Sequence, residues 1–359
     1  MVTKPQARAW SDLPIPPGEL LQEELDAIGM TQQELARRTD RPAQVINEII
    51  RAKKRITHET ALDLEKVLGI PAHVWVNLEG DYQLTEARLR DEEQLGRQED
   101  WLQEFPVREM EKRGWIPTCP EKIDKVRELL RFLGVASFSA CEQTAVAFRI
   151  TPRAKVSSGA LAVWLRKGEL DGREIDAAPY DESRFREALS TIRTFTREDP
   201  NVFVPRMTEM CAGAGVAVVF TQELPGSAAH GSARWLAQDK ALIHLSLRGK
   251  KDDQLWFSFF HEACHVLWHR VREIHIDGID GDDSDEAEAN RFAEDALIPA
   301  DAWKDFSRVG AWSPATVQQF ADQIGVAPGI IVGRLQHEKL IGWGSALNRL
   351  KVTLNWSED

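Results

Sequence analysis

The chain lacks the features that mark membrane, secreted and disulfide-bonded proteins. None of its apolar runs approaches the roughly 18 to 20 residues needed to span a bilayer. Residues 1–17 contain no apolar stretch of the kind found in secretory signals. The four cysteines show no C-x-x-C spacing, which argues against a disulfide framework and against a Cys-based zinc finger. We therefore expect a cytoplasmic protein with no membrane partner.

The chain also has no excess of positive charge, because 57 acidic residues outweigh 45 basic ones and give a net charge of −12. This balance excludes a general affinity for nucleic acid, so any DNA contact must come from a local basic patch. With 359 residues, the chain is long enough for two or three domains with cores of their own.

Residues 1–80 have the pattern of a small all-helical domain with a helix-turn-helix. Thr31 and Glu34 belong to a T-x-x-E capping box that predicts a helix start, and Pro42 suits the first turn of the next helix. Only two acidic residues lie between Arg37 and Arg55, against seven basic ones: Arg37, Arg38, Arg41, Arg51, Lys53, Lys54 and Arg55. The alternative is a helical bundle with an ordinary solvated basic face, but capping, turn and charge coincide here.

The second helix of such a pair lies in the major groove, where its N-terminal residues meet base edges. By residue type and position, we expect Arg41, Gln44 and Asn47 to contact bases. The cations expected to bind phosphates are Arg51, Lys53, Lys54 and Arg55. The expected partner is a palindromic operator DNA, bound by a homodimer.

Residues 81–200 are expected to form a helical connector. From 81 to 104 the pattern is helical and very polar, which is typical of a solvated face. The rest of the connector is mostly helical in pattern, and no set of residues in it indicates a chemical role.

Residues 201–359 have a mixed pattern. Strands are predicted at 215–220, 232–236 and 241–247, the last with strict apolar alternation. A helix follows from about 253 to 270. It contains the string HEACH, which begins at His261 and is an H-E-x-x-H motif. The fold class we expect is α+β and predominantly helical, with a zincin-like C-terminal domain whose small three-stranded sheet packs on this helix.

The motif predicts a zinc site. Residues four apart project from one face of a helix, so His261 and His265 can bind one Zn²⁺ while Glu262 stands beside a zinc-bound water. The alternative is a core helix in which both histidines are hydrogen-bonded inside the protein.

Catalytic zinc sites have three protein ligands, so a third must come from elsewhere. On the helix predicted at 285–298, Glu286 lies nearest the apolar face among the acids, about 50° from its centre. We therefore expect zinc to be bound by His261, His265 and Glu286. Asn290, one turn further on, can accept the N–H of a ligating imidazole. In metzincins, a third histidine ligand comes six residues after the second and follows a Gly turn. Here no such glycine is present and His269 comes four residues after His265, so we do not expect His269 to bind zinc.

The expected chemistry is peptide hydrolysis. Zinc lowers the pKa of bound water from 15.7 toward ~7, and Glu262 can take its proton and pass it to the leaving amine. Both tyrosines precede the motif, so oxyanion stabilisation falls to His337, Arg334 or His244. A domain that binds zinc without cleaving is the other possibility.

Residues 18–82 resemble the helix-turn-helix of the Xre family, and specifically the HigA-type antitoxins. The resemblance rests on the stretch from GELLQEELDAIGMTQQELARRTDRPAQV to the end of NLEGDYQL. One departure is Ala52 in RAKK, where the family usually has glycine. If φ is positive there, alanine costs somewhat more than glycine.

Residues from about 215 to 340 resemble the ImmA/IrrE zinc peptidases. The matching stretches are SLRGKKDDQLWFSFFHEACHVLWH, DEAEANRFAEDALIP and APGIIVGRLQHEKLIGW. The resemblance implies that His261, His265 and Glu286 are zinc ligands and that Glu262 is catalytic. Members of the family cleave Xre-type repressors, whereas here both kinds of unit share one chain.

Together these patterns favour a DNA-binding regulator with a zinc endopeptidase domain that cleaves itself or a partner regulator. A substrate segment is expected to add to the strand at 241–247, with His244 and Ser246 lining the cleft. The alternative is a non-enzymatic antitoxin or repressor whose metal domain binds a toxin or a small ligand.

Overall fold

The computed structural model describes residues 13–141, 157–269, 275–276, 284–308 and 310–356. Most of the stretch expected to lack a secretory signal, residues 1–12, lies outside the described residues, as do residues 142–156 of the expected connector. No helix in the described part of the chain is long and apolar enough to cross a membrane. The chain divides into two compact units, Met1–Glu99 and Asp100–Asp359, which we call the N-terminal and C-terminal units.

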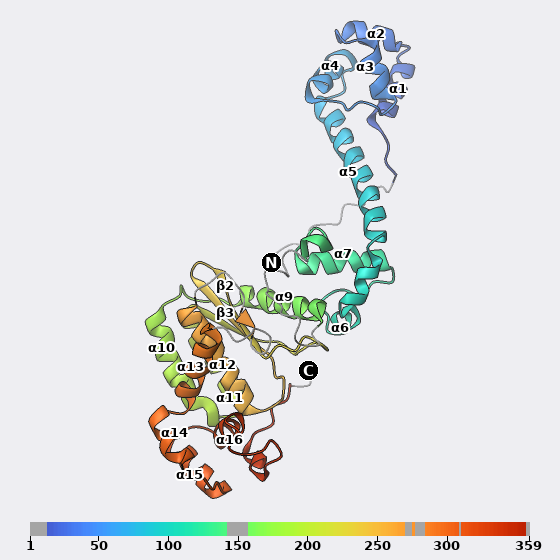
Figure 1. Ribbon diagram of the computed structural model, residues 1–359. Coiled ribbons are helices and arrows are strands. Elements are labelled where there is room, and N and C mark those ends of the chain that lie inside the picture. The colour runs from blue at the N-terminus through green and yellow to red at the C-terminus, as the bar shows by residue number, and fades with distance from the viewer. Residues whose placement is uncertain (1–12, 142–156, 270–274, 277–283, 309, 357–359) are drawn as a thin grey trace. The chain divides into compact units, whose positions relative to one another are not determined.

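The N-terminal unit is entirely helical within the described residues, as the sequence predicts (Figure 1). Its helices are α1 (Pro17–Ala27), α2 (Gln32–Arg38), α3 (Ala43–Ile50), α4 (His58–Leu68) and α5 (Ala72–Gly96). The apolar faces of these helices enclose one core that includes Leu21, Leu35, Ile46, Leu64 and Trp75.

Local sequence sets the helix boundaries of this unit. The Thr31 side chain accepts a hydrogen bond from the Glu34 N–H at 3.1 Å, as an N-cap should. The Glu34 carboxylate binds Arg37 and Arg38 instead of turning back, so only half of the expected capping box forms. Ala52 has a φ of 54°, which confirms that alanine stands at a left-handed position after α3.

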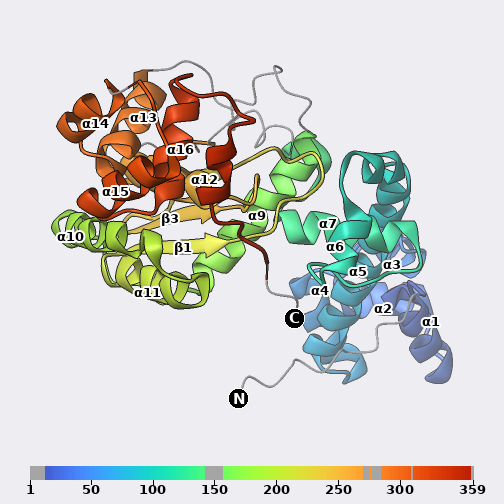
Figure 2. The same ribbon diagram turned by 90° about the horizontal axis from the view of Figure 1, so that it is seen from below.

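The C-terminal unit surrounds a small sheet with helices (Figures 1 and 2). Its elements after η1 (Glu99–Glu104) are α6 (Val107–Lys112), α7 (Lys122–Leu133), α9 (Ser158–Glu174), α10 (Glu182–Ile192), η2 (Arg193–Arg197), α11 (Pro200–Gly213), β1 (Val216–Phe220), β2 (Gly231–Ala237), β3 (Lys240–Leu245), α12 (Asp252–Trp268), β4 (His275–Ile276), α13 (Ser284–Leu297), α14 (Ala300–Ser307), α15 (Pro314–Ile324), α16 (Pro328–His337) and η3 (Ala346–Leu350).

The sheet contains the three predicted strands and adds the two-residue strand β4, in the order β1-β3-β2-β4. β3 pairs in parallel with β1 and antiparallel with β2, so its backbone bonds are used on both sides. The expectation that a substrate adds to β3 is therefore wrong. Alternation identified β3 as a strand but carries no information about its neighbours.

The two faces of the sheet meet different helices. Ile243 and Leu245 of β3 join the core that contains Phe259 of α12. His244 points to the other face, where Gly168 of α9 approaches so closely that a Cβ there would lie 2.2 Å from the His244 ring. One face of the sheet is thus covered by α12 and the other by α9.

Two features of the structure lie across the expected boundaries at residues 80 and 200. Residue 80 lies inside the continuous helix α5. Phe185 and Ile192 of α10 belong to the same core as α12, because their apolar face completes it. The division into residues 1–80, 81–200 and 201–359 stays a prediction about function.

Candidate metal centre

The HEACH motif lies in the C-terminal half of α12, a helix that is apolar on almost every side and therefore buried. The exposed fractions of His261, Glu262 and His265 are 1%, 0% and 2%. Polar groups so far from water need partners inside the protein, and these partners define the site.

The side chains of His261, His265 and Glu286 converge, with Glu286 coming from the first turn of α13. The Nε2 atoms of the two histidines are 3.1 Å apart, and each lies 3.2 Å from an oxygen of the Glu286 carboxylate. One ligand atom from each residue can be chosen so that all three lie within 4.8 Å of one another. Glu286, the acid expected from the helix wheel, is thus the one that the fold brings to both imidazoles.

Asn290 sets the tautomer of His261. Its Oδ1 lies 3.0 Å from His261 Nδ1, and since an amide oxygen only accepts, Nδ1 carries the proton. The Nε2 of neutral His261 is then an unprotonated lone pair that faces Glu286.

A second chain of hydrogen bonds, which the sequence analysis missed, orients His265. Glu288 Oε2 accepts from His269 Nε2 at 3.0 Å, and in the tautomer with the proton on Nε2 the Nδ1 atom of His269 is an acceptor. His269 Nδ1 lies 3.0 Å from His265 Nδ1, which must therefore donate. His265 Nε2 is again a lone pair. The sequence signal that could have revealed this contact is the four-residue spacing of His265 and His269 on one helix.

The electrostatics agree with these tautomers. Burial lowers the pKa of His265 and outweighs the opposing effect of the neighbouring Glu286 carboxylate, which favours the neutral imidazole at pH 7. Burial raises the pKa of Glu286, but the neighbouring His261 and His265 outweigh this effect and bring the value to about 2.

The donor set fits a divalent cation. Two imidazole lone pairs and one ionised carboxylate point at one another, an arrangement that is repulsive without a positive charge between them. Two nitrogens, one carboxylate and a further open position are the ligand set of catalytic zinc.

Glu262 lies on a neighbouring side of α12, next to the first residue of β2. A Cβ added to Gly231 would lie 2.8 Å from Glu262 Oε1, so glycine leaves the space that the carboxylate occupies. The sheet therefore limits where the Glu262 side chain can go.

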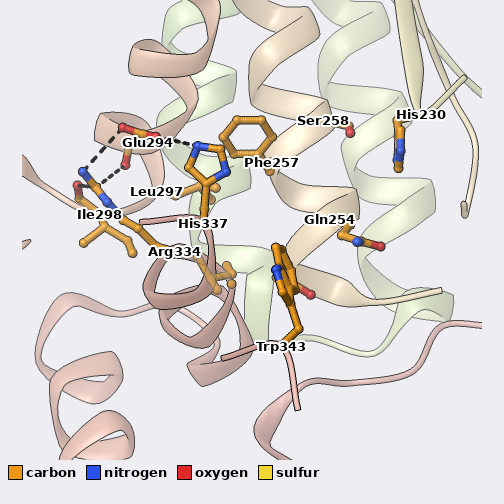
Figure 3. Close-up of a pocket in the computed structure, with 13 residues that line it drawn as sticks. His230, Gln254, Phe257, Ser258, Glu294, Leu297, Ile298, Arg334, His337 and Trp343 are labelled. Carbon is orange, nitrogen blue, oxygen red and sulfur yellow. Dashed lines mark hydrogen bonds and ion pairs between the residues drawn. The ribbon is translucent and has the colours of Figure 1, made fainter. Parts of the chain in front are cut away.

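The three residues considered for stabilising an oxyanion are not among the converging side chains of His261, His265 and Glu286. His244 is fully buried against Trp164, with ring centroids 3.6 Å apart, and burial lowers its pKa to about 3. The expectation that His244 lines a cleft is wrong, because β3 turns it toward α9. Ser246 donates to the Ala229 carbonyl at 2.8 Å. Arg334 and His337 line a separate pocket (Figure 3).

In the N-terminal unit, the expected base-contacting residues already have partners. Arg41 forms an ion pair with Asp63 of α4 at 2.9 Å. Gln44 donates to Glu48 at 2.8 Å, and Asn47 donates to the Gln32 side chain at 3.1 Å. Their roles toward DNA stay predictions, and Arg41 gains a role inside the domain that the sequence analysis did not foresee.

The expected phosphate-binding residues have a different environment. All four are exposed, follow α3 directly and have no ion pair among the described residues; they are Arg51, Lys53, Lys54 and Arg55. Elsewhere in the unit, Arg37 and Arg38 bind Glu34. The four cations thus form an uncompensated basic cluster.

Comparison with known proteins separates the same two regions. Residues 21–75 match the helix-turn-helix family model, and residues 214–335 match the IrrE N-terminal-like domain of the M78 peptidase family. The second family is metallopeptidase-like, which implies a metal at the centre described above.

The similar proteins cover the N-terminal region. The uncharacterized HTH-type transcriptional regulator YddM of Escherichia coli (strain K12) is 31% identical over 71 residues, or 20% of this chain and 76% of the relative. Virulence-associated protein I of Dichelobacter nodosus is 39% identical over 71 residues, or 20% of this chain and 66% of the relative. The solved structure of the Pseudomonas aeruginosa antitoxin HigA with the higBA promoter is 31% identical, covering 23% of this chain and 90% of that chain, with a TM-score of 0.22. The chain belongs to the helix-turn-helix family through its N-terminal unit and carries an IrrE N-terminal-like domain around the HEACH motif.

Proposed function

We propose that this chain is a DNA-binding transcriptional regulator whose IrrE-like domain is a zinc-dependent endopeptidase that cleaves the chain itself or a partner regulator. One observation carries the proposal: the Nε2 atoms of His261 and His265 each lie 3.2 Å from an oxygen of the Glu286 carboxylate, beside the acid of an H-E-x-x-H motif.

In this proposal, His261, His265 and Glu286 hold Zn²⁺, and Asn290 fixes the His261 ring. Zinc, when bound, polarises the scissile carbonyl and makes water more acidic. Glu262 takes a proton from the attacking water and gives it to the leaving amine, so that water adds across the C–N bond. The sequestered position of Glu262 against Gly231 holds the carboxylate in place for this transfer.

The DNA-binding half of the proposal rests on α3 and the basic cluster that follows it. A homodimer would present two copies of α3 to a palindromic operator. Gln44 and Asn47 are the base-contacting candidates on the helix. Arg41 stands just before α3, where its contact with Asp63 fixes the guanidinium. The cations Arg51, Lys53, Lys54 and Arg55 would bind the phosphates.

The peptidase half is tested by measuring bound zinc and cleavage together. The full chain, Glu262→Gln and His261→Ala are incubated with a peptide library made from digested cell protein, and new peptide ends are identified by mass spectrometry. We expect one zinc per chain and cleavage for the wild type, zinc without cleavage for Glu262→Gln, and neither for His261→Ala. Equal cleavage by wild type and Glu262→Gln would contradict the assignment of Glu262.

The DNA half is tested by selecting duplexes from a random library with the full chain. Lys53→Ala/Lys54→Ala should reduce the salt slope of binding by about 2, because each cation releases about 0.9 counterions. Arg37→Ala is the matched control, since Arg37 already pairs with Glu34. An unchanged slope in the double variant would remove the basic cluster from the interface.

The burial of Glu262 favours a second candidate function. At 0% exposure, its carboxylate reaches water only if the site opens. A domain that holds zinc but stays closed would serve as a binding module, and the protein would be an antitoxin-like repressor whose metal domain binds a toxin or a small ligand. Zinc without cleavage in the wild type would favour this function.

A further inference from the structure

A pocket of about 260 Å³ lies in the C-terminal unit and is lined in part by residues of α12 (Figure 3). Gln254, Phe257 and Ser258 line it from α12 and precede His261 by seven, four and three residues. These spacings put them on the face of the helix that carries His261. The ring centroids of Phe257 and His261 are 6.0 Å apart, so one side chain adjoins both the pocket and the metal centre.

The pocket offers apolar surface. Phe257, Leu297, Ile298 and Ile330 line it, and the ring of Phe257 lies 6.5 Å from that of His337. Figure 3 shows the side chains of Phe257, His337, Trp343 and Gln254 arranged around the space. Contacts of this kind suit an aliphatic or aromatic group, whose burial is driven by the apolar area removed from water.

The charged groups at the wall already have partners of opposite charge. Arg334 binds Glu338 at 3.0 Å, lies 3.6 Å from Glu294 and stacks on the ring of Trp303 at 4.6 Å. Asp253 forms an ion pair with Lys351 at 2.6 Å. A charged occupant would lose its hydration without gaining an uncompensated partner, so the wall disfavours it.

Trp343 marks the mouth of the pocket. Its backbone carbonyl accepts from Asn348 Nδ2 at 2.7 Å and from Gln336 Nε2 at 3.3 Å, which fixes this segment beside α16. The side chain is nevertheless 69% exposed. A large aromatic ring held at the surface next to an apolar pocket is typical of a contact that dominates recognition of a partner.

We propose that this pocket receives one large apolar side chain, of the leucine, methionine or phenylalanine class, from the peptide bound at the metal centre. The inference rests on the proposed peptidase function and adds its substrate class. The volume supports a single side chain, because sites for drug-sized ligands measure roughly 300 to 1,000 Å³. Phe257 links the two sites, so a peptide held at the metal centre has a neighbouring side chain within reach of the pocket.

The test uses zinc-loaded full chain and small hydroxamates, which bind zinc through their two oxygens. Calorimetry compares acetohydroxamate with the N-acetyl hydroxamates of leucine, phenylalanine and lysine. We expect the leucine and phenylalanine compounds to bind at least about 10-fold more tightly than acetohydroxamate, and the lysine compound to show no such gain.

Variants then connect the gain to the pocket. Ile330→Trp fills the space and should abolish the gain while leaving acetohydroxamate binding unchanged. Trp343→Ala, at the exposed mouth, should reduce the gain and serves if Ile330→Trp fails to fold. The matched control is Trp268→Ala, because Trp268 is also exposed and lies on α12 but does not line the pocket.

The outcomes separate the inference from the function on which it rests. If acetohydroxamate binds and the apolar side chains add nothing, or if the gain survives both pocket variants, the inference is overturned alone. If no zinc is bound and acetohydroxamate shows no binding, the proposed peptidase fails and the inference fails with it. An equal gain from the lysine compound overturns the apolar class.

Discussion

The two units of this chain differ in whether their charged side chains are exposed or buried. Among the described residues of the N-terminal unit, the only buried polar side chains are those of Thr39 and Thr60, and its charged groups lie at the surface. The C-terminal unit buries three carboxylates and three histidines on α12 and its C-cap alone: Asp252, Asp253, His261, Glu262, His265 and His269.

The difference follows from what each unit binds in the proposed function. A polyanion such as DNA is met by exposed cations that give up their counterions, so charge is useful where solvent reaches it. A metal ion is held by lone pairs withdrawn from water and oriented by further hydrogen bonds. The basic cluster after α3 has the first arrangement. The hydrogen bonds from His265 through His269 to Glu288, which we call the relay, belong to the second.

Removing the metal should have the largest effect and should act on one unit only. At a free zinc concentration of 1,000 times the dissociation constant, binding stabilises the C-terminal unit by about 4 kcal/mol. A chelator should therefore lower the unfolding temperature of this unit in calorimetry of the full chain. The transition of the N-terminal unit and the salt slope of DNA binding should not move. If both transitions shift together, the contrast between the units is overturned.

Replacing Asp252 or its neighbour Asp253 by asparagine should change the stability of the C-terminal unit in opposite directions. Burial, and then the charge of Asp253, raise the pKa of Asp252 from 3.8 to about 6, so its ionisation opposes folding. Stability of the C-terminal unit should fall by about 3 kcal/mol as the pH rises from about 4 to about 6. Asp252→Asn keeps an acceptor for the Val352 N–H and should remove this loss, with little effect near pH 3.

Asp253→Asn is the control for that change. It breaks the buried ion pair with Lys351 and should destabilise the unit by about 3 kcal/mol at pH 7. Urea unfolding of both variants at pH 4 and pH 7 measures the signs. Equal losses in the two variants would show that Asp252 is stabilising in its ionised form.

The relay behind His265 predicts a smaller effect, on metal affinity. Glu288→Gln weakens the bond that orients His269 and, through it, His265. Zinc affinity should fall about 10- to 100-fold. Asp295→Asn, which removes one exposed charge from the same helix, should leave the affinity unchanged. Competition with a chromophoric chelator measures both, and equal affinities would exclude a role for the relay.

The smallest effect is expected on the stability of the N-terminal unit, and it depends on backbone conformation and not on charge. Ala52 and Gly69 have φ values of 54° and 75° at the ends of α3 and α4. Ala52→Gly should stabilise the unit by about 0.5 to 1 kcal/mol, and Gly69→Ala should destabilise it by about 1 kcal/mol. Hydrogen exchange of amides in the N-terminal unit measures both. A loss of protection in Ala52→Gly would contradict the predicted strain.

Much of this structure could be predicted because its signals are local. The positions of α12, α13, β1, β2 and β3 follow from apolar periodicity within each segment. Glu286 could be chosen because the apolar face of α13 had to meet the core, and that face also carries the acid toward α12. Asn290 follows by the same reasoning, one turn further along the helix.

The relations that the sequence analysis missed join residues that are distant along the chain. Arg41 binds Asp63 across 22 positions, and His269 binds Glu288 across 19. The interior place of β3 depends on β1 and β2 packing on either side, which alternation within β3 does not encode. The helix wheel of α13 does not single out Glu288, because it does not include the end of α12, where His269 lies.

The sequence by itself determined the helix-turn-helix, the HEACH helix, the identity of the three converging side chains of His261, His265 and Glu286, and the basic cluster after α3. Each depends on spacing within a helix, where 3.6 residues per turn convert sequence into direction. The tertiary structure alone decided which imidazole nitrogen faces Glu286, that β3 is paired on both sides, and that an apolar pocket adjoins the centre. These depend on how separate elements meet, and side-chain packing between distant segments sets that arrangement.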